Sequence, residues 1–181
     1  MQASRHFADR LDLLRSEYPD EYTDDVLASG WLGYLPATDM QIEATEKRLG
    51  LTLPPSYKSF LKVSNGWRAI DDFINRLWPV EEIDWLASTD PDNVAAWVEA
   101  SAGQAEPLYE SRHIASTLQI SDIEYAGTAV LLLNPKVVNP SGEWEAWFMA
   151  HWVPGADTYP SFWEMMQERY SSFLYVEASP R

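Results

Sequence analysis

A predicted helix with a capped start and an abrupt stop, between Thr38 and Gly50, constrains the fold of this chain more than any other feature of its sequence. Thr38 and Gln41 have the spacing of a capping box, in which each side chain bonds the other residue's backbone N–H. Ile42 and Leu49 then fall on one face of the helix. Gly50 favours termination because it adopts positive φ at little cost.

A second predicted helix follows at once and ends in a sharp reversal. Pro54-Pro55 suits a helix start, because proline lacks the N–H that the first turn leaves unbonded. Asn65-Gly66 suits the reversal, since both residues tolerate positive φ. Apolar side chains share one face between these two signals. The pattern therefore predicts two short helices joined by a tight turn.

The last third of the chain has the patterns of β-strands. Residues 128–134 form a continuous apolar run, which is typical of a central strand. Residues 116–121 and 143–152 alternate, and 135–142 carries the Pro and Gly of a turn. A final helix over 161–176 has a predicted apolar side of Phe162, Met165, Met166, Tyr170, Phe173 and Leu174. Helices first and strands later predict an α+β fold, a single domain in which a mostly antiparallel sheet packs against helices.

The first 30 residues predict an N-terminal helical extension. Phe7, Leu11 and Leu14 recur at helical spacing, and Pro19 ends the helix. The apolar segment 31–36 is expected to lie against the core. The predicted organisation is one domain over residues 1–181, with the extension at 1–30 and the core at 38–176.

The helical pair resembles the signature of the SUKH superfamily, the Smi/Knr-like proteins. That signature has a Glu before Leu-Gly, then Leu-Pro, Tyr and Phe-Leu on the next helix, and a closing Asn-Gly. The resemblance is strong over residues 38–67, and elsewhere it concerns only the layout of elements. The residues that carry it are Glu46, Leu49, Gly50, Leu53, Pro54, Tyr57, Phe60, Leu61, Asn65 and Gly66.

The resemblance implies a function as well as a fold. Bacterial members of the superfamily are similar to immunity proteins, which bind and neutralise polymorphic or contact-dependent toxins, often nucleases. It therefore implies an immunity protein for a cognate toxin, and not an enzyme. The alternative that it leaves open is a scaffold or regulator of the same fold that binds a partner unrelated to toxins.

The charge of the chain is one-sided. It has 28 acidic residues against 13 Lys and Arg, for a formal net charge of -15. Such a surface disfavours nucleic acid and anionic membranes as partners and favours a basic protein. General solubility explains the acidity about equally well. Residues 81–110 are the most one-sided stretch, with eight acidic residues and no basic one.

Aromatic and acidic side chains supply the candidate binding site. Trp67 follows the Asn-Gly reversal, and Trp147 lies on the opposite strand face from Trp144. Either tryptophan could be an exposed anchor, because tryptophan is enriched at binding hot spots, or could pack within the fold. Four other tryptophans are expected in the core, namely Trp78, Trp144, Trp152 and Trp163. The candidate partner-binding residues are Trp67, Asp71, Asp72, Glu81, Glu82, Asp84 and Trp147.

Catalytic, metal and cofactor motifs are missing from the sequence. There is no cysteine, and the three histidines do not have a metal-binding spacing. Glu43 and Glu46 could pair as acid and base, but a structural role in their helix is favoured. A hydrolase remains a third hypothesis, which would need a pocket that holds His113 or His151 beside a carboxylate. No catalytic residue, metal or cofactor is therefore predicted.

The sequence also bears on where the protein works. The charged N-terminus lacks the apolar region of a signal peptide, and no apolar run approaches the length of a membrane span. These features predict a cytoplasmic protein that contacts neither membrane nor nucleic acid. It is expected to be a monomer or a weak homodimer.

Overall fold

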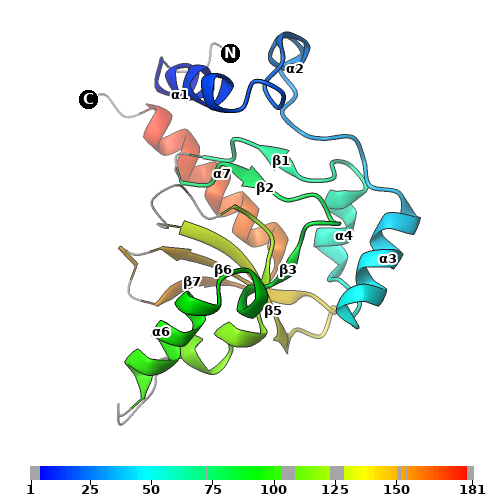
Figure 1. The fold of residues 1–181 in the computed structure, drawn as a ribbon, viewed down its shortest axis with the longest axis vertical. Helices are drawn as coiled ribbons and strands as arrows, with labels where there is room; N and C mark the ends of the chain where they lie inside the picture. Colours follow the sequence, from blue (N-terminus) through cyan, green and yellow to red (C-terminus); the bar gives the residue numbers. More distant parts are fainter. Residues whose placement is uncertain are drawn as a thin grey trace.

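The centre of the molecule is a five-stranded antiparallel sheet in the order β3-β4-β5-β6-β7 (Figure 1). The computed structural model describes residues 5–71, 73–102, 109–122, 129–150, 152–153 and 155–178. The strands of this sheet are β3 (Asp84–Trp85), β4 (Leu118–Gln119), β5 (Ala129–Val138), β6 (Trp144–Ala150) and β7 (Ala156–Tyr159). A second, two-stranded sheet pairs β1 (Trp67–Arg68) with β2 (Arg76–Leu77).

Helices lie on both faces of the large sheet, and the predicted α+β single-domain fold is confirmed. The α-helices are α1 (Arg5–Glu17), α2 (Asp24–Ser29), α3 (Asp39–Leu49), α4 (Pro55–Leu61), α5 (Leu86–Thr89), α6 (Pro91–Ser101) and α7 (Phe162–Ala178). Two 3-10 turns follow α6, at η1 (Glu110–Arg112) and η2 (Ile114–Ser116). Within the described ranges, none of these helices has both the length and the apolar character needed to cross a bilayer.

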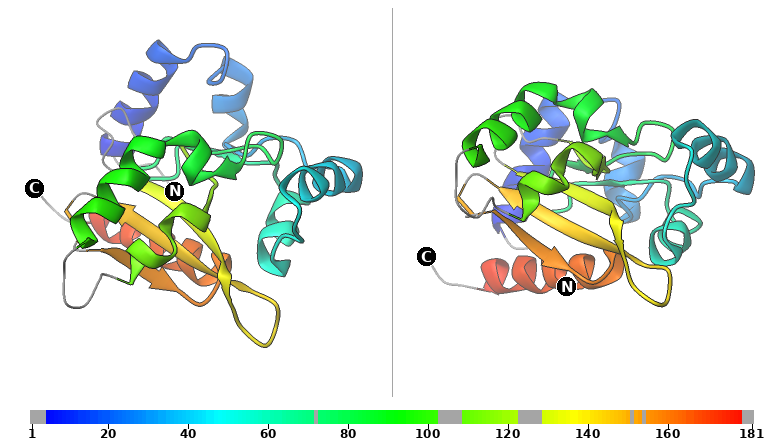
Figure 2. Two further views of the ribbon diagram at one scale, coloured as in Figure 1. Left: turned by 60° about the horizontal axis from the view of Figure 1, so that its bottom comes forward. Right: turned by 90° about the horizontal axis from the view of Figure 1, so that it is seen from below.

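The middle strand, β5, is buried on both faces, as its continuous apolar sequence predicts. Leu131 and Leu133 pack into the main core with α4 and α7. Val130 and Leu132 point the other way, into a second cluster with α5, α6 and η2. Figure 2 shows this layering, with α7 on one side of the sheet and α6 with its neighbours on the other.

The alternating sequence of β6 predicts one buried face, but both of its faces are buried. Trp144, Ala146 and Phe148 belong to the main core, whereas Trp147 and Met149 belong to the second cluster. The second face of β6 is buried because α5, α6 and η2 cover it. The pattern of a single strand does not indicate that a distant segment will form such a layer.

The helical pair is confirmed, including its caps. Thr38 Oγ1 accepts a hydrogen bond from the Gln41 N–H at 3.2 Å, and Gln41 Oε1 accepts one from the Thr38 N–H at 2.8 Å. Asn65 Oδ1 then accepts the Val80 N–H at 2.8 Å, which ties the reversal to the loop after β2. Gly66 has φ of 99°. A Cβ there would lie 2.6 Å from the Leu77 carbonyl oxygen, so only glycine fits.

Several local expectations are wrong. Residues 135–142 are not all turn, because β5 continues to Val138 through a register shift after Asn134. The strand β7 has no counterpart among the predicted elements. Trp152 and Trp163 are exposed, although their positions predict burial. Leu35 is 86% exposed, so the segment 31–36 does not pack against the core along its whole length.

The two N-terminal helices rest on the β1–β2 sheet through a small cluster of their own. Leu14 and Tyr22 are buried there against Ala69. Polar contacts add to this packing: Arg10 donates to Asn75 Oδ1 at 2.6 Å, and Tyr34 donates to Glu21 at 2.8 Å. The helix α2 ends at Gly30, which has φ of 66°.

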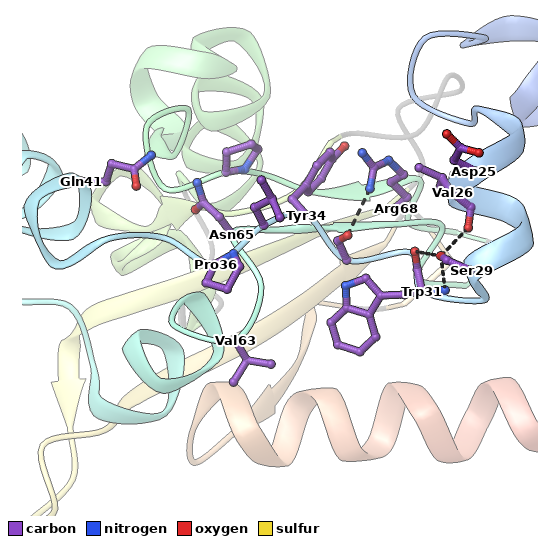
Figure 3. A pocket seen from close by; sticks show the side chains of 13 residues that line it. Asp25, Val26, Ser29, Trp31, Tyr34, Pro36, Gln41, Val63, Asn65 and Arg68 are labelled. Atoms are coloured by element: carbon purple, nitrogen blue, oxygen red, sulfur yellow. Dashed lines mark hydrogen bonds between the residues drawn. The ribbon is translucent and has the colours of Figure 1, made fainter.

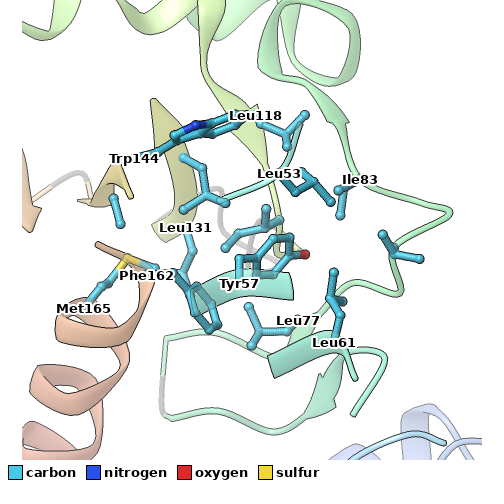
Figure 4. Packing of buried hydrophobic residues seen from close by; sticks show 14 of the residues in the cluster. Leu53, Tyr57, Leu61, Leu77, Ile83, Leu118, Leu131, Trp144, Phe162 and Met165 are labelled. Carbon is cyan, nitrogen blue, oxygen red and sulfur yellow. The ribbon is translucent and has the colours of Figure 1, made fainter. Parts of the chain in front are cut away.

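The main core contains a hydroxyl that forms no hydrogen bond within the described residues, that of Tyr57 (Figure 4). Its ring packs edge-on against Phe162 at 4.9 Å, and burial raises the pKa of the phenol. An unsatisfied buried hydroxyl costs stability, so Tyr57→Phe is expected to raise the free energy of unfolding by about 1 kcal/mol.

Urea denaturation of both proteins measures this difference. Tyr34→Phe is the matched control, because it removes a hydroxyl that is bonded to Glu21, and it is expected to destabilise the fold by about 1–3 kcal/mol. If Tyr57→Phe also destabilised the protein, its hydroxyl would have a partner that the described residues do not include.

Candidate protein-binding surface

Two grooves meet at a pair of tryptophans on the side of the molecule where α2, the segment 31–36 and α7 lie. Trp31 and Trp67 contact edge to face, with ring centroids 4.7 Å apart. Trp31 lines one groove and Trp67 the other. Trp31 is 47% exposed and Trp67 is half-buried. A rigid aromatic pair at the border of two hollows is the kind of feature on which protein partners anchor.

The first hollow, here named the linker groove, has a volume of about 830 Å³ (Figure 3). It runs along residues 31–36 between α2 and the turn that connects α4 to β1. Exposed apolar side chains border it, among them Leu35 and Val63. Adjacent exposed apolar residues of this kind mark interaction surfaces more often than isolated ones do.

Arg68 fixes the shape of the linker groove. Its guanidinium lies 3.8 Å from the centre of the Tyr34 ring and donates to Glu21 at 3.2 Å. It also donates to the carbonyls of Leu32 and Gly33. Burial, reinforced by the hydrogen bond to Glu21, raises the pKa of Tyr34, which therefore stays a neutral donor. The segment 31–36 is thus held beside β1, to which Gly33 forms an antiparallel bridge at Trp67.

The second hollow, here named the α7 groove, has a volume of about 390 Å³ and lies between α7 and the β1–β2 sheet. Its lining is almost wholly apolar. It consists of Gly30, Leu32, Phe60, Trp67, Ala69, Ile70, Leu77, Met166, Arg169, Tyr170 and Phe173. Of the sequence-predicted binding residues that the structure describes, Trp67 alone contributes to it.

A buried ion pair lies beside the α7 groove and corrects the prediction for Asp71. Asp71 is buried, and its Oδ2 lies 2.9 Å from Arg169 Nε. Its Oδ1 accepts the backbone N–H groups of Phe73 and Ile74. The Arg169 guanidinium also lies 4.0 Å from the centre of the Phe148 ring. Asp71 therefore joins the β1–β2 loop to α7 and is not presented to a partner.

The acidic residues at 81–84 are on the surface but already have intramolecular partners. Glu81 accepts hydrogen bonds from Asn65 and Gln41. Glu82 pairs with Arg76 at 2.9 Å and Asp84 with Arg48 at 3.5 Å. None of the three lines either groove. A partner would have to compete with these contacts, which weakens the case for them as binding residues.

Glu81 gives the fold a pH dependence. Partial burial alone would raise its pKa, but the hydrogen bonds from Asn65, from the backbone and from Gln41 leave the pKa below its ordinary value of 4.5. A lowered pKa in the folded state stabilises the protein above pH 4.5, and this contribution is lost as the pH falls through the folded-state pKa.

Glu81→Gln is therefore expected to be slightly less stable than the wild type at neutral pH, by at most about 1 kcal/mol because the side chain is exposed. The two proteins should converge as the pH is lowered below 4.5. Urea denaturation at a series of pH values measures the gap. A gap that stays constant down to about pH 3 would contradict this role.

Of the two remaining predicted residues, the structure describes Trp147 alone. Trp147 is fully buried in the second cluster, where its Nε1 donates to Glu145 at 2.5 Å, so the prediction of an exposed anchor is corrected. The layer over that face of β6 is the reason. Asp72 lies outside the described residues.

Sequence reasoning missed most of the groove residues. Trp31 falls in a segment predicted to pack inward, and Tyr170 and Phe173 fall on the predicted apolar side of the last helix. The width of the apolar side of the last helix could have indicated the groove. This side is wider than the sheet can cover, so Tyr170 remains 63% exposed.

The described residues offer little for catalysis. No three His, Asp or Glu side chains within them gather as a metal-ion site. His113 packs against the Tyr109 ring at 5.0 Å and lines neither groove. Tyr109 donates to Glu145, and its pKa is raised to about 12 by burial and by that hydrogen bond. His151 lies outside the described residues.

Comparison with models of protein families gives a match. The model of the SMI1 / KNR4 family (SUKH-1) matches residues 36–168. No curated protein matches the chain. The matched range leaves out α1, α2 and Trp31 at one end, and Arg169, Tyr170 and Phe173 at the other.

Proposed function

Because the chain belongs to the SMI1/KNR4 family (SUKH-1), we propose that it is an immunity protein, which binds a cognate polymorphic or contact-dependent toxin and neutralises it in the cytoplasm. Such a role requires binding and no catalysis, cofactor, nucleic acid or membrane. The observation that carries the binding role is the Trp31–Trp67 pair between two grooves, in which Trp31 is exposed and Trp67 half-buried. A surface of this kind supplies affinity through a few aromatic anchors.

The net charge of -15 supports a basic toxin domain as the partner. Nucleases are a natural class, because an enzyme that binds phosphate needs a basic cleft. Opposite charges accelerate the encounter of two proteins, and salt screens this effect. The association rate should therefore fall as the ionic strength rises.

Co-expression with the product of the adjacent gene, which the proposal expects to be the toxin, tests the immunity role. Host cells that express the toxin alone should stop growing, and cells that also express this chain should recover. The two proteins should co-purify as a complex of one chain each. Growth arrest that persists despite expression of the folded chain would reject the immunity role and favour a scaffold of the same fold.

A further inference from the structure

We propose that the α7 groove binds an amphipathic, basic helix of the partner protein, which lies along α7. This inference deepens the proposed function and rests on it as far as the partner is a toxin. The chemistry of the groove, the spacing of side chains on α7 and the net charge of the chain support it independently of the toxin's identity.

The lining of the groove selects apolar side chains. Among the described residues that line it, Arg169 alone is charged, and its guanidinium is already paired with Asp71 and packed on Phe148. A charged group that entered the groove would lose water without gaining a free counter-charge. The volume of about 390 Å³ leaves room for more than one large side chain.

The spacing along α7 favours a helix as the occupant. Trp163, Met166, Tyr170 and Phe173 follow one another at intervals of three, four and three residues. This is the spacing of a seam that pairs with a second helix. Met166, Tyr170 and Phe173 line the groove, and the exposed Trp163 extends the seam by one turn. A helix laid along α7 would insert its own apolar positions between them.

The net charge of -15 favours a basic occupant and disfavours a second copy of this chain. Asp25 on α2 is an exposed carboxylate that lines the adjoining linker groove, whereas Asp24 pairs with Arg15 at 2.5 Å. Glu164 and Glu168 are exposed on α7, about 120° and 160° around the helix from Tyr170. The described side chains of these two helices include no exposed basic residue. Two copies packed through α7 would bring like charges together, which costs free energy, whereas lysines beside the apolar stripe of a partner helix would be attracted.

A designed peptide tests the groove without knowledge of the toxin. The probe is a helical peptide of about 20 residues with leucines at i, i+3, i+4 and i+7 and lysines elsewhere, and its counterpart has glutamates in place of lysines. Calorimetric titration of the full chain should show binding of the basic peptide, weakened by salt, and none of the acidic one. Equal binding of both peptides would overturn the proposal.

Two tyrosines of α7 locate the binding. Tyr170 lines the groove and is 63% exposed, whereas Tyr175 is 77% exposed and lies about 140° further around the helix. Tyr170→Ser should weaken binding of the basic peptide about tenfold or more, and Tyr175→Ser should change it less than about twofold. Both variants should melt within error of the wild type. Equal effects of the two substitutions would place the peptide elsewhere and overturn the proposal.

The same variants separate the groove from the function when the neighbouring toxin is the ligand. Full neutralisation of the toxin by the Tyr170→Ser variant would overturn the proposal that the α7 groove binds the partner, but it would support the immunity role. Peptide binding as expected, with no neutralisation by the wild type, would reject the immunity role and leave the groove standing. Sedimentation that shows a wild-type dimer, dissociated by Tyr170→Ser, would identify a second copy as the occupant and overturn the proposal.

Discussion

Asp71→Asn is expected to lower the free energy of unfolding by about 3–5 kcal/mol, although it hardly changes the size of the side chain. Asparagine keeps the oxygen that accepts the Phe73 and Ile74 N–H groups, so the loop contacts survive. What is lost is the negative charge 2.9 Å from Arg169 Nε. Arg169 is itself buried and would be left as an uncompensated cation.

Urea denaturation measures this loss, and two further variants define its cause. Adding Arg169→Met to Asp71→Asn should restore part of the stability, because no unpaired buried charge then remains. Lys62→Met breaks an exposed ion pair with Asp39 and should leave the free energy of unfolding nearly unchanged. If the Asp71→Asn protein kept wild-type stability but failed to bind its partner, Asp71 would be a partner-binding residue and not a structural one.

Trp147→Ala is the second substitution with a large expected effect, again about 3–5 kcal/mol. Trp147 is fully buried between Leu86, Val94 and Ile114, and it is among the largest fully buried side chains described. Alanine would leave a cavity that the surrounding helices and sheet can fill only in part. It would also remove the indole N–H that donates to Glu145.

Thermal and urea denaturation measure the effect of Trp147→Ala against a matched tryptophan. Trp163 is 58% exposed on α7, and its replacement by alanine should change the stability by no more than about 0.5 kcal/mol. Similar stabilities of the two variants would mean that the second cluster contributes little. Loss of partner binding by a stable Trp147→Ala protein would support the original expectation of an anchor.

The sequence predicted those elements whose signals are local. The cap at Thr38, the stop at Gly50 and the reversal at Asn65-Gly66 depend on residues within a few positions of each other, and each is present. The central strand β5 could be predicted equally well, because a strand that is buried on both faces requires an uninterrupted apolar run. In contrast, β7 is short and half polar, and it is a strand through its pairing with β6.

The binding surface was less predictable, because it depends on which segments cover which faces. The sequence pattern of Asp71 and Trp147 is compatible with exposure. In the structure Asp71 is buried because it pairs with Arg169 of α7, and Trp147 is buried because a helical layer from another part of the chain covers it. Trp31 and Tyr170 look like core residues, yet nothing in the described structure covers their outer sides. Only the arrangement in three dimensions distinguishes the two pairs.

The position of the grooves relative to the family match has an evolutionary consequence. Gly30 and Leu32 precede the matched range, and Arg169, Tyr170 and Phe173 follow it. The core inside that range can therefore be kept while the flanking groove positions vary, provided that Arg169 remains to pair with the buried Asp71. Rapid diversification against new partners would then leave the folding of the sheet and its helical pair intact.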